Sequence, residues 1–130
     1  MRHLNKNNIK GCPETIGVYK IYAFDDIGIA IPISRFGGVD DSGLLYIGET
    51  TKQNLKRRIH NFWMTSRLEL NTHNHSGALK YRLNETIRKV LGINHILSFD
   101  VEFVEKPKQR EKELLNEYAA IYGEFPPLNR

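Results

Sequence analysis

A carboxylate stands at the edge of an apolar helix face near the end of the chain. Glu117 lies three residues after Leu114 and four before Ile121. At about 100° per residue it borders the apolar line that these two residues draw. A carboxylate at such a boundary is partly shielded from water, which suits a metal ligand or an acid with a shifted pKa. A solvated charge or a salt-bridge partner fits the same position, so both interpretations stay open.

Arg58 occupies an equivalent place on an earlier helix. It stands between Leu55 and Phe62 at helical spacing, again beside an apolar face. A guanidinium there either snorkels over the core or holds a phosphate with its planar fork. The neighbouring Lys56 and Arg57 point elsewhere and are interpreted as solvated or phosphate-facing charges.

Two tyrosines lie close to glycines in apolar segments. Tyr19 comes two residues after Gly17, and Tyr46 comes two before Gly48. Tyrosine beside glycine in a strand is typical of core packing with a close backbone approach. A catalytic phenol is the alternative for each.

Two histidines, His73 and His75, precede a further helix that Ser76 is expected to cap. A zinc site would need a third ligand, and none is close in sequence. His75 lies directly before the helix start, where anions such as phosphate are attracted. Both histidines are equally compatible with plain loop positions.

In combination these residues resemble the GIY-YIG nuclease superfamily. Gly17-Val18-Tyr19 and Tyr46-Ile47-Gly48 are similar to its paired motifs, and Leu55-Lys56-Arg57-Arg58 is similar to the Leu-x-x-Arg of its first helix. His75-Ser76 resembles the His-Ser of phage homing endonucleases in the family. The stretch from Glu117 to Asn129 resembles the closing element of excision-repair nucleases. The likeness therefore runs from about Thr15 to Asn129.

The resemblance implies hydrolysis of DNA phosphodiester bonds with one divalent ion, Mg²⁺ or Mn²⁺. Glu117 would be the metal ligand, since Mg²⁺ keeps most of its waters and needs few carboxylates. Arg58 would brace phosphate oxygens, and Tyr19 would act as the base with Tyr46 as its neighbour. The ordinary tyrosine pKa near 10 is too high for this role, so positive charge must lower it. His75 would position a phosphate or shuttle a proton.

Further positions would support DNA binding. Asn129 is expected to fix the local backbone and the Glu117 helix. Phosphate contacts outside the active site would dominate affinity, and the residues expected near the DNA are Gly48, Lys56, Arg57, Lys80, Arg82 and Arg88. A homodimer or an inserted arm would substitute for the attached specificity domain that homologous nucleases often carry.

The chain departs from the family pattern in three places. Tyr19 and Tyr46 are farther apart than usual, which predicts an inserted arm over residues 25–43. Phe62 stands where many members have His or Tyr, so His60 or His75 would have to carry the proton. Glu49 replaces a common Lys after the second motif. These departures motivate the alternative function, a catalytically weak or inactive nucleic-acid-binding module with the nuclease fold.

The elements that must hold these residues follow from periodicity. Strands are predicted at 17–24, 44–48 and 99–104, with 29–33 at best an edge strand and 37–43 a loop. Helices are predicted from Lys52 to about Arg67, from Ser76 to Leu91, and from Pro107 to Gly123, the last burying Leu114, Tyr118 and Ile121. The order predicts an α+β fold: a small, mainly antiparallel three-stranded sheet flanked by helices.

Bulk properties bound the function. The 130 residues fit one domain, with residues 1–14 a polar lead-in. The net charge of +4 and the pI near 9.2 favour a polyanionic partner such as DNA. The single cysteine, Cys12, excludes an internal disulfide and a cysteine-based metal site. No apolar run approaches the roughly 20 residues of a membrane helix, so a cytoplasmic protein without membrane contact is expected.

Overall fold

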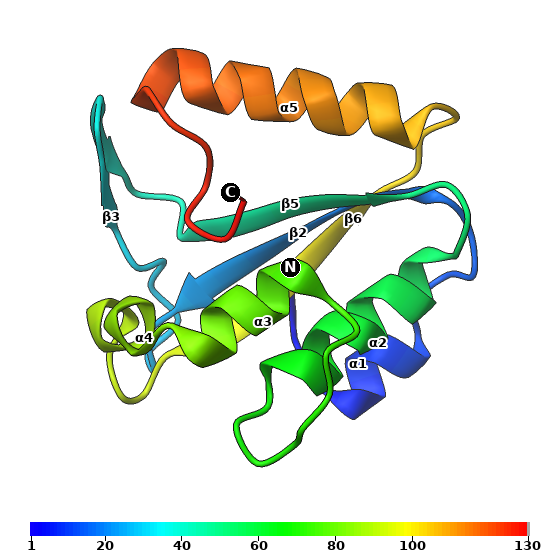
Figure 1. Cartoon of the computed structure of the whole chain (residues 1–130), viewed down its shortest axis with the longest axis horizontal. Helices are drawn as coiled ribbons and strands as arrows, with labels where there is room; N and C mark the ends of the chain where they lie inside the picture. The colour runs from blue at the N-terminus through cyan, green and yellow to red at the C-terminus, as the bar shows by residue number, and fades with distance from the viewer. Residues whose placement is uncertain (130) are drawn as a thin grey trace.

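The computed structural model describes residues 1–129 and has an α+β architecture. A four-stranded antiparallel sheet has the order β1-β6-β2-β5, and a separate two-stranded ribbon pairs β3 with β4. Helices cover both faces of the main sheet: α5 lies alone on one face, and α1 to α4 lie on the other (Figure 1). Within residues 1–129 no helix has the length and apolar character to cross a membrane.

The bounds of the elements are as follows. The strands are β1 (Arg2–His3), β2 (Gly17–Phe24), β3 (Ile33–Arg35), β4 (Gly38–Asp40), β5 (Leu44–Thr50) and β6 (Ile96–Glu102). The helices are α1 (Lys6–Lys10), α2 (Leu55–Ser66), α3 (Ser76–Leu83), α4 (Glu85–Leu91) and α5 (Pro107–Tyr122).

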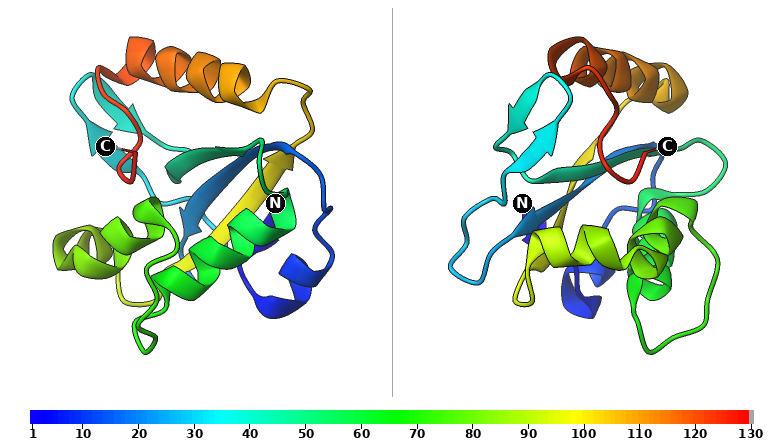
Figure 2. Two further views of the ribbon diagram at one scale, coloured as in Figure 1. Left: turned by 45° about the vertical axis from the view of Figure 1, so that its right-hand side comes forward. Right: turned by 60° about the vertical axis from the view of Figure 1, so that its left-hand side comes forward.

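The sheet separates two apolar clusters, as its two-sided covering requires (Figure 2). On the side of α1 to α4, Tyr19 and Ile21 of β2 pack with Phe62 of α2. On the other side, Val18 of β2 packs with Leu114 and Tyr118 of α5 and with β5 side chains. Because side chains alternate across a strand, β2 contributes to both clusters and is the structural centre of the protein.

A β-bulge near the start of β5 changes the face of the sheet on which its side chains lie. The register pairs Ile21 with Tyr46 and then Tyr22 with Leu44, so Leu45 is the extra residue. Leu45 and Tyr46 therefore both pack on the α1–α4 side, whereas Leu44 packs toward α5. Bulges are frequent next to functional sites because they redirect side chains in this way. The strand predicted at 44–48 is confirmed and extends to Thr50.

Side-chain caps explain where the helices differ from the sequence-based expectation. α2 begins at Leu55, not Lys52, because the Asn54 side chain accepts the Arg57 N–H at 2.8 Å. The single helix predicted over 76–91 is wrong: Asn84 is extended, and its side chain caps α4 by accepting from the Ile87 N–H. A short polar side chain that bonds the backbone competes with continuation of a helix.

The N-terminal residues are also more ordered than predicted. The expected polar lead-in contains β1, which pairs with β6 (Arg2 opposite Phe99), and α1, which Asn5 caps. The sheet thus has four strands, not three. The strand predicted at 99–104 is shifted to Ile96–Glu102, because it follows the register of β2 from Phe24 to Val18.

The arm between β2 and β5 folds back on α5. The predicted loop at 37–43 is partly wrong, because Gly38–Asp40 forms β4 against β3. Asp40 is 1% exposed; its Oδ2 accepts from the Tyr118 hydroxyl of α5 at 2.7 Å, and its Oδ1 accepts from Ser42. Ile121, predicted to face the core, is 66% exposed, since the arm and β5 meet the Tyr118 side of α5 instead.

Replacing Tyr118 by Phe is expected to lower the free energy of unfolding by about 1 to 3 kcal/mol, because it leaves one oxygen of a buried carboxylate without its donor. Chemical denaturation measures the change. Tyr22→Phe is the matched control: Tyr22 is half-buried and its hydroxyl forms no hydrogen bond with residues 1–129, so its effect should stay below about 0.5 kcal/mol. Equal effects of the two changes would contradict the assigned role of the Asp40–Tyr118 bond.

Candidate active site

Four rings, from β2, β5, α2 and the start of α3, meet on the face of the sheet that α1 to α4 cover. The Tyr19 hydroxyl lies 2.7 Å from His75 Nε2. The Tyr46 ring centroid lies 6.0 Å from that of Tyr19 and 5.1 Å from that of His75, and Phe62 packs 4.9 Å from His75. Tyr19, Phe62 and His75 are almost fully buried, whereas Tyr46 is partly exposed. Tyr19 and His75 are 56 residues apart in the sequence, and the fold brings all four side chains into one cluster.

Two glycines make room for the Tyr46 ring. Gly48 pairs with Tyr19 across the sheet, and a Cβ at Gly48 would lie 2.6 Å from the Tyr19 hydroxyl oxygen and 2.7 Å from the Tyr46 ring. A Cβ at Gly77 would lie 2.7 Å from the other edge of the same ring. The buried Gly48, predicted to lie near DNA, is therefore a packing position: it allows both tyrosine rings to approach the β5 backbone.

His75 is neutral and has an inferred tautomer. It is the N-cap of α3, where Ser76 was predicted, and its Nδ1 accepts the Ala78 N–H at 3.2 Å. A neutral imidazole has one acceptor and one donor nitrogen, so the network assigns the proton to Nε2, which donates to Tyr19. Burial, followed by the charge of Arg58, lowers the pKa of His75 to about 3.

Tyr46 lies beside this hydrogen-bonded pair. His75 donates to Tyr19, and Tyr19 in turn acts to lower the pKa of Tyr46. Burial still dominates, together with the Glu111 charge, and the net pKa of Tyr46 is raised, although Arg58 acts in the opposite direction. The pKa of Tyr19 is raised well above its ordinary value, first by burial and then by Tyr46.

At neutral pH both phenols are consequently protonated in the protein alone. The expectation that positive charge lowers a tyrosine pKa is met only in part, because Arg58 lowers both values but burial outweighs it. Arg58 is half-buried on α2, and its guanidinium donates weakly to the Asn74 carbonyl at 3.4 Å. It is the cation that acts on all three of Tyr19, Tyr46 and His75.

Tyr46 opens onto a pocket of about 350 Å³ beside the outer edge of β5. Ser76 and Lys80 of α3, Glu111 of α5 and Asn129 also line it. The side chain of Asn129 forms two 2.9 Å hydrogen bonds with the backbone of Ile47, so it fastens the C-terminal segment to β5. The pocket thus places one phenol, one exposed lysine and one half-buried carboxylate together.

Glu117, the predicted metal ligand, does not line this pocket. It is exposed, and its charge acts on Arg110, which lies seven residues earlier on α5. Glu111 lies seven residues before Tyr118, which is two helical turns, and therefore shares its face of the helix. The spacing of Glu111, Leu115 and Tyr118 in the sequence already places them on one side of a helix. The sequence-based prediction instead assigned Ile121 to the buried face.

The remaining predicted residues are dispersed. Arg82 is 8% exposed and its guanidinium donates to the Leu70 and Thr72 carbonyls, so it holds the loop before α3. Arg88 lies on α4 near Tyr81, outside the cluster. His60 is exposed on the opposite side of α2 from His75, in a groove that also contains Lys56 and Arg57.

No group of three or more His, Cys, Asp or Glu side chains that would hold a metal ion occurs in the part of the chain that the structure describes. A closed cage of protein ligands is therefore not formed within residues 1–129. Mg²⁺ does not require one, because it commonly binds through one or two carboxylates together with water and substrate phosphates.

Comparison with known proteins gives no match: no family, no curated protein and no solved structure is similar to this chain.

The buried His75 is expected to make the fold acid-sensitive. Its folded-state pKa near 3 lies below the ordinary 6.5, so between these values the unfolded chain binds a proton that the folded protein does not. Stability is therefore lost as the pH falls through 6.5 toward 3. Comparing unfolding free energies at pH 7 and pH 4.5, we expect His75→Asn, which retains a capping oxygen, to lose less by on the order of 2 kcal/mol. The same pH dependence in both proteins would show that His75 does not titrate as described.

Proposed function

We propose that this protein hydrolyses phosphodiester bonds of DNA at the pocket between Tyr46 and Glu111. The observation that carries the proposal is the meeting of Tyr46 with Tyr19, His75 and the Arg58 charge beside a pocket that also contains Glu111 and Lys80.

Each group has a definite task in an attack by water on a phosphodiester. Tyr46, which is partly exposed, orients the attacking water. To accept the proton of that water it must first release its own phenolic proton to solvent, which a metal ion bound in the pocket would favour. Tyr19 is a positioning residue: it is 1% exposed, too deep to touch substrate, and its ring packs 6.0 Å from that of Tyr46. This reverses the order expected from the sequence, where Tyr19 was the base.

The cations serve the phosphate. Arg58 is oriented toward the tyrosines and offers a planar fork for two phosphate oxygens, where charge grows in the transition state. Lys80 is exposed at the rim of the pocket and offers a point charge to the next phosphate.

Glu111 is our choice of metal ligand, in place of Glu117. It shares the pocket with Tyr46, and its charge acts on that phenol. A hard oxygen donor in an open pocket fits Mg²⁺ or Mn²⁺. Bound there, the ion would stabilise the leaving oxygen and offset the effect of Glu111 on the pKa of Tyr46.

The resemblance to the GIY-YIG superfamily supports the same proposal from the order of its motifs. The tyrosines of both motifs meet on paired strands, in the register Tyr19–Gly48, and the Arg58 helix and the His75 helix start lie against them. The antiparallel sheet with helices on both faces is compatible with that family. The family assignment and the nuclease activity are tested together by the experiment below.

One observation favours the second candidate, a nucleic-acid-binding module without appreciable cleavage. The pKa values of both tyrosines are raised, and Phe62, buried against His75, gives no proton carrier at its position. Binding of DNA without cleavage under any divalent metal would identify this alternative.

Glu111→Gln and Glu117→Gln form a matched pair, because the same change is made six residues apart on one helix. With supercoiled plasmid or branched DNA and Mg²⁺ or Mn²⁺, we expect the cleavage rate to fall at least about 100-fold for Glu111→Gln and by about the same factor for Arg58→Ala. Glu117→Gln should cleave within about twofold of the wild type, since its carboxylate is exposed outside the pocket.

Unfolding midpoints of all three variants, measured alongside, separate lost chemistry from lost structure. Normal cleavage by Glu111→Gln with inactivity of Glu117→Gln would overturn the choice of ligand. Absence of cleavage by the wild type with either metal would overturn the proposed activity.

A further inference from the structure

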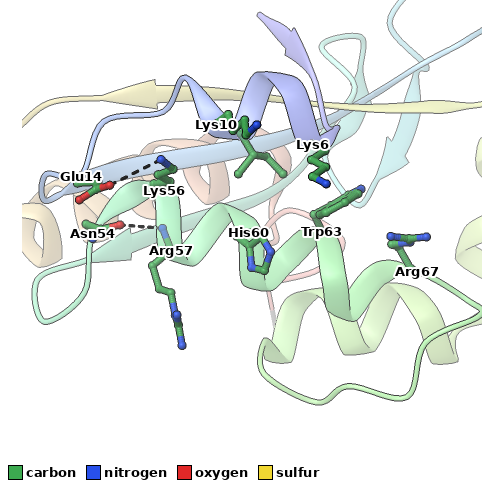
Figure 3. A pocket seen from close by; sticks show the side chains of 10 residues that line it. Lys6, Lys10, Glu14, Asn54, Lys56, Arg57, His60, Trp63 and Arg67 are labelled. Carbon is green, nitrogen blue, oxygen red and sulfur yellow. Dashed lines mark hydrogen bonds and ion pairs between the residues drawn. The ribbon is translucent and has the colours of Figure 1, made fainter.

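A groove between α1 and α2 gathers basic and aromatic side chains away from the Tyr46 pocket. It has a volume of about 640 Å³, within the range of about 300 to 1,000 Å³ that is usual for ligand sites. Helical spacing builds both walls. Lys6 and Lys10 are four residues apart on α1, and Lys56, His60, Trp63 and Arg67 follow one side of α2 and its end (Figure 3).

The groove holds the net positive charge of the whole protein. Five basic residues line it, namely Lys6, Lys10, Lys56, Arg57 and Arg67, against one acidic residue, Glu14. The chain has 19 basic and 15 acidic residues. The rest of the chain is therefore balanced, with 14 of each, so the basic character that suggested a polyanionic partner belongs to this one place.

Three of these cations are available to an incoming anion. Lys56 lies 3.6 Å from Glu14, and Arg67 lies 2.7 Å from Glu69 at the rim. Lys6, Lys10 and Arg57 are exposed and form no ion pair within residues 1–129. Like charges gathered without counter-charges repel one another, and an anionic ligand removes that repulsion.

Aromatic surface lies among the cations. Trp63 is half-buried in the groove, with the His60 ring 6.0 Å away edge-on and the Arg67 guanidinium 5.0 Å from the ring centroid. The buried Ile9 anchors α1 beside it. Aromatic side chains interleaved with cations are the usual means of holding unpaired bases and their phosphates. The stacked bases of a duplex offer no face to such a ring.

We propose that the α1–α2 groove binds a single-stranded segment of nucleic acid, with a base against Trp63 and phosphates on Lys6, Lys10 and Arg57. The choice of nucleic acid as the polyanion rests on the proposed function. Arg57 lines the groove, and the adjacent Arg58 acts on Tyr19 and Tyr46. The substrate that fits both places is DNA with an unpaired segment.

The test measures fluorescence anisotropy of a labelled 15-nucleotide oligothymidylate with the full chain in EDTA, where no metal-dependent cleavage occurs. Lys6→Glu/Lys10→Glu should weaken binding at least about tenfold and reduce the slope of log affinity against log salt by about 1.4, at about 0.7 per lost contact. Trp63→Leu should weaken binding at least about fivefold, whereas Trp63→Phe, which keeps an aromatic face, should lose less.

The matched control is Lys89→Glu/Lys108→Glu, which makes the same charge change at exposed sites on α4 and α5. At physiological salt, charges beyond the Debye length of about 8 Å are screened, so this control should change affinity less than about twofold. Unfolding midpoints confirm that each variant is folded.

Several results would overturn the inference: equal losses in the groove and control variants, wild-type binding by the groove variants, tighter binding of a 15-base-pair duplex than of the strand, or equal binding of polyglutamate, which has no base for Trp63. Cleavage that depends on Glu111 with unaltered groove variants would leave the proposed function standing without the groove. Groove-dependent strand binding without cleavage would leave the groove as a binding site and overturn the proposed function.

Discussion

The buried hydrogen bond between Tyr19 and His75 is the constraint on which the rest of the structure depends. It joins the central strand β2 to the start of α3, and it fixes which ring nitrogen carries the proton, because the other nitrogen caps the helix. A charged imidazole would carry a proton on Nδ1 as well and could no longer accept from the Ala78 N–H, so the site is built around a neutral histidine. Gly48 and Gly77 then allow Tyr46 to lie against the pair. Regular alternation along β5 places Tyr46 on the same side as Gly48, and the bulge adds Leu45 to that side.

Helix α2 carries charged side chains on two sides. Arg58 on one side acts on Tyr19 and Tyr46, and the side with Trp63 forms the groove with α1. The Arg58 side suits the stabilisation of transition-state charge on a single phosphate, because its groups converge on one point at short range. The second is suited to length along a strand, because its cations are spread over two helices. Together they fit the proposed function, in which the protein holds an unpaired strand and acts on a phosphate of that strand.

Periodicity predicted the elements whose apolar lines are unambiguous. The strand at Gly17–Phe24 and the helix from Pro107 to Gly123 were located correctly, since Phe24 precedes a turn and Gly123 adopts a left-handed cap. Periodicity failed where tertiary contacts decide. Asn84 can either continue a helix or cap a new one, and in the structure it caps α4, which separates α4 from α3. Glu117 and Glu111 both border apolar residues, and only the packing of Tyr118 against the Asp40 arm shows which side of α5 is inward. The motifs did not predict the groove, because Lys6 and Lys10 lie in the segment that was predicted to be a polar lead-in.

The central claim is that Glu111, beside Tyr46, is the group that binds the divalent ion. Anomalous diffraction from crystals soaked in Mn²⁺ tests it most directly, since manganese scatters anomalously and carboxylate oxygens do not. The account predicts a peak at about 2.1 Å from a Glu111 carboxylate oxygen, within the pocket that Tyr46 and Asn129 line. A peak at Glu117 and none in that pocket would contradict it.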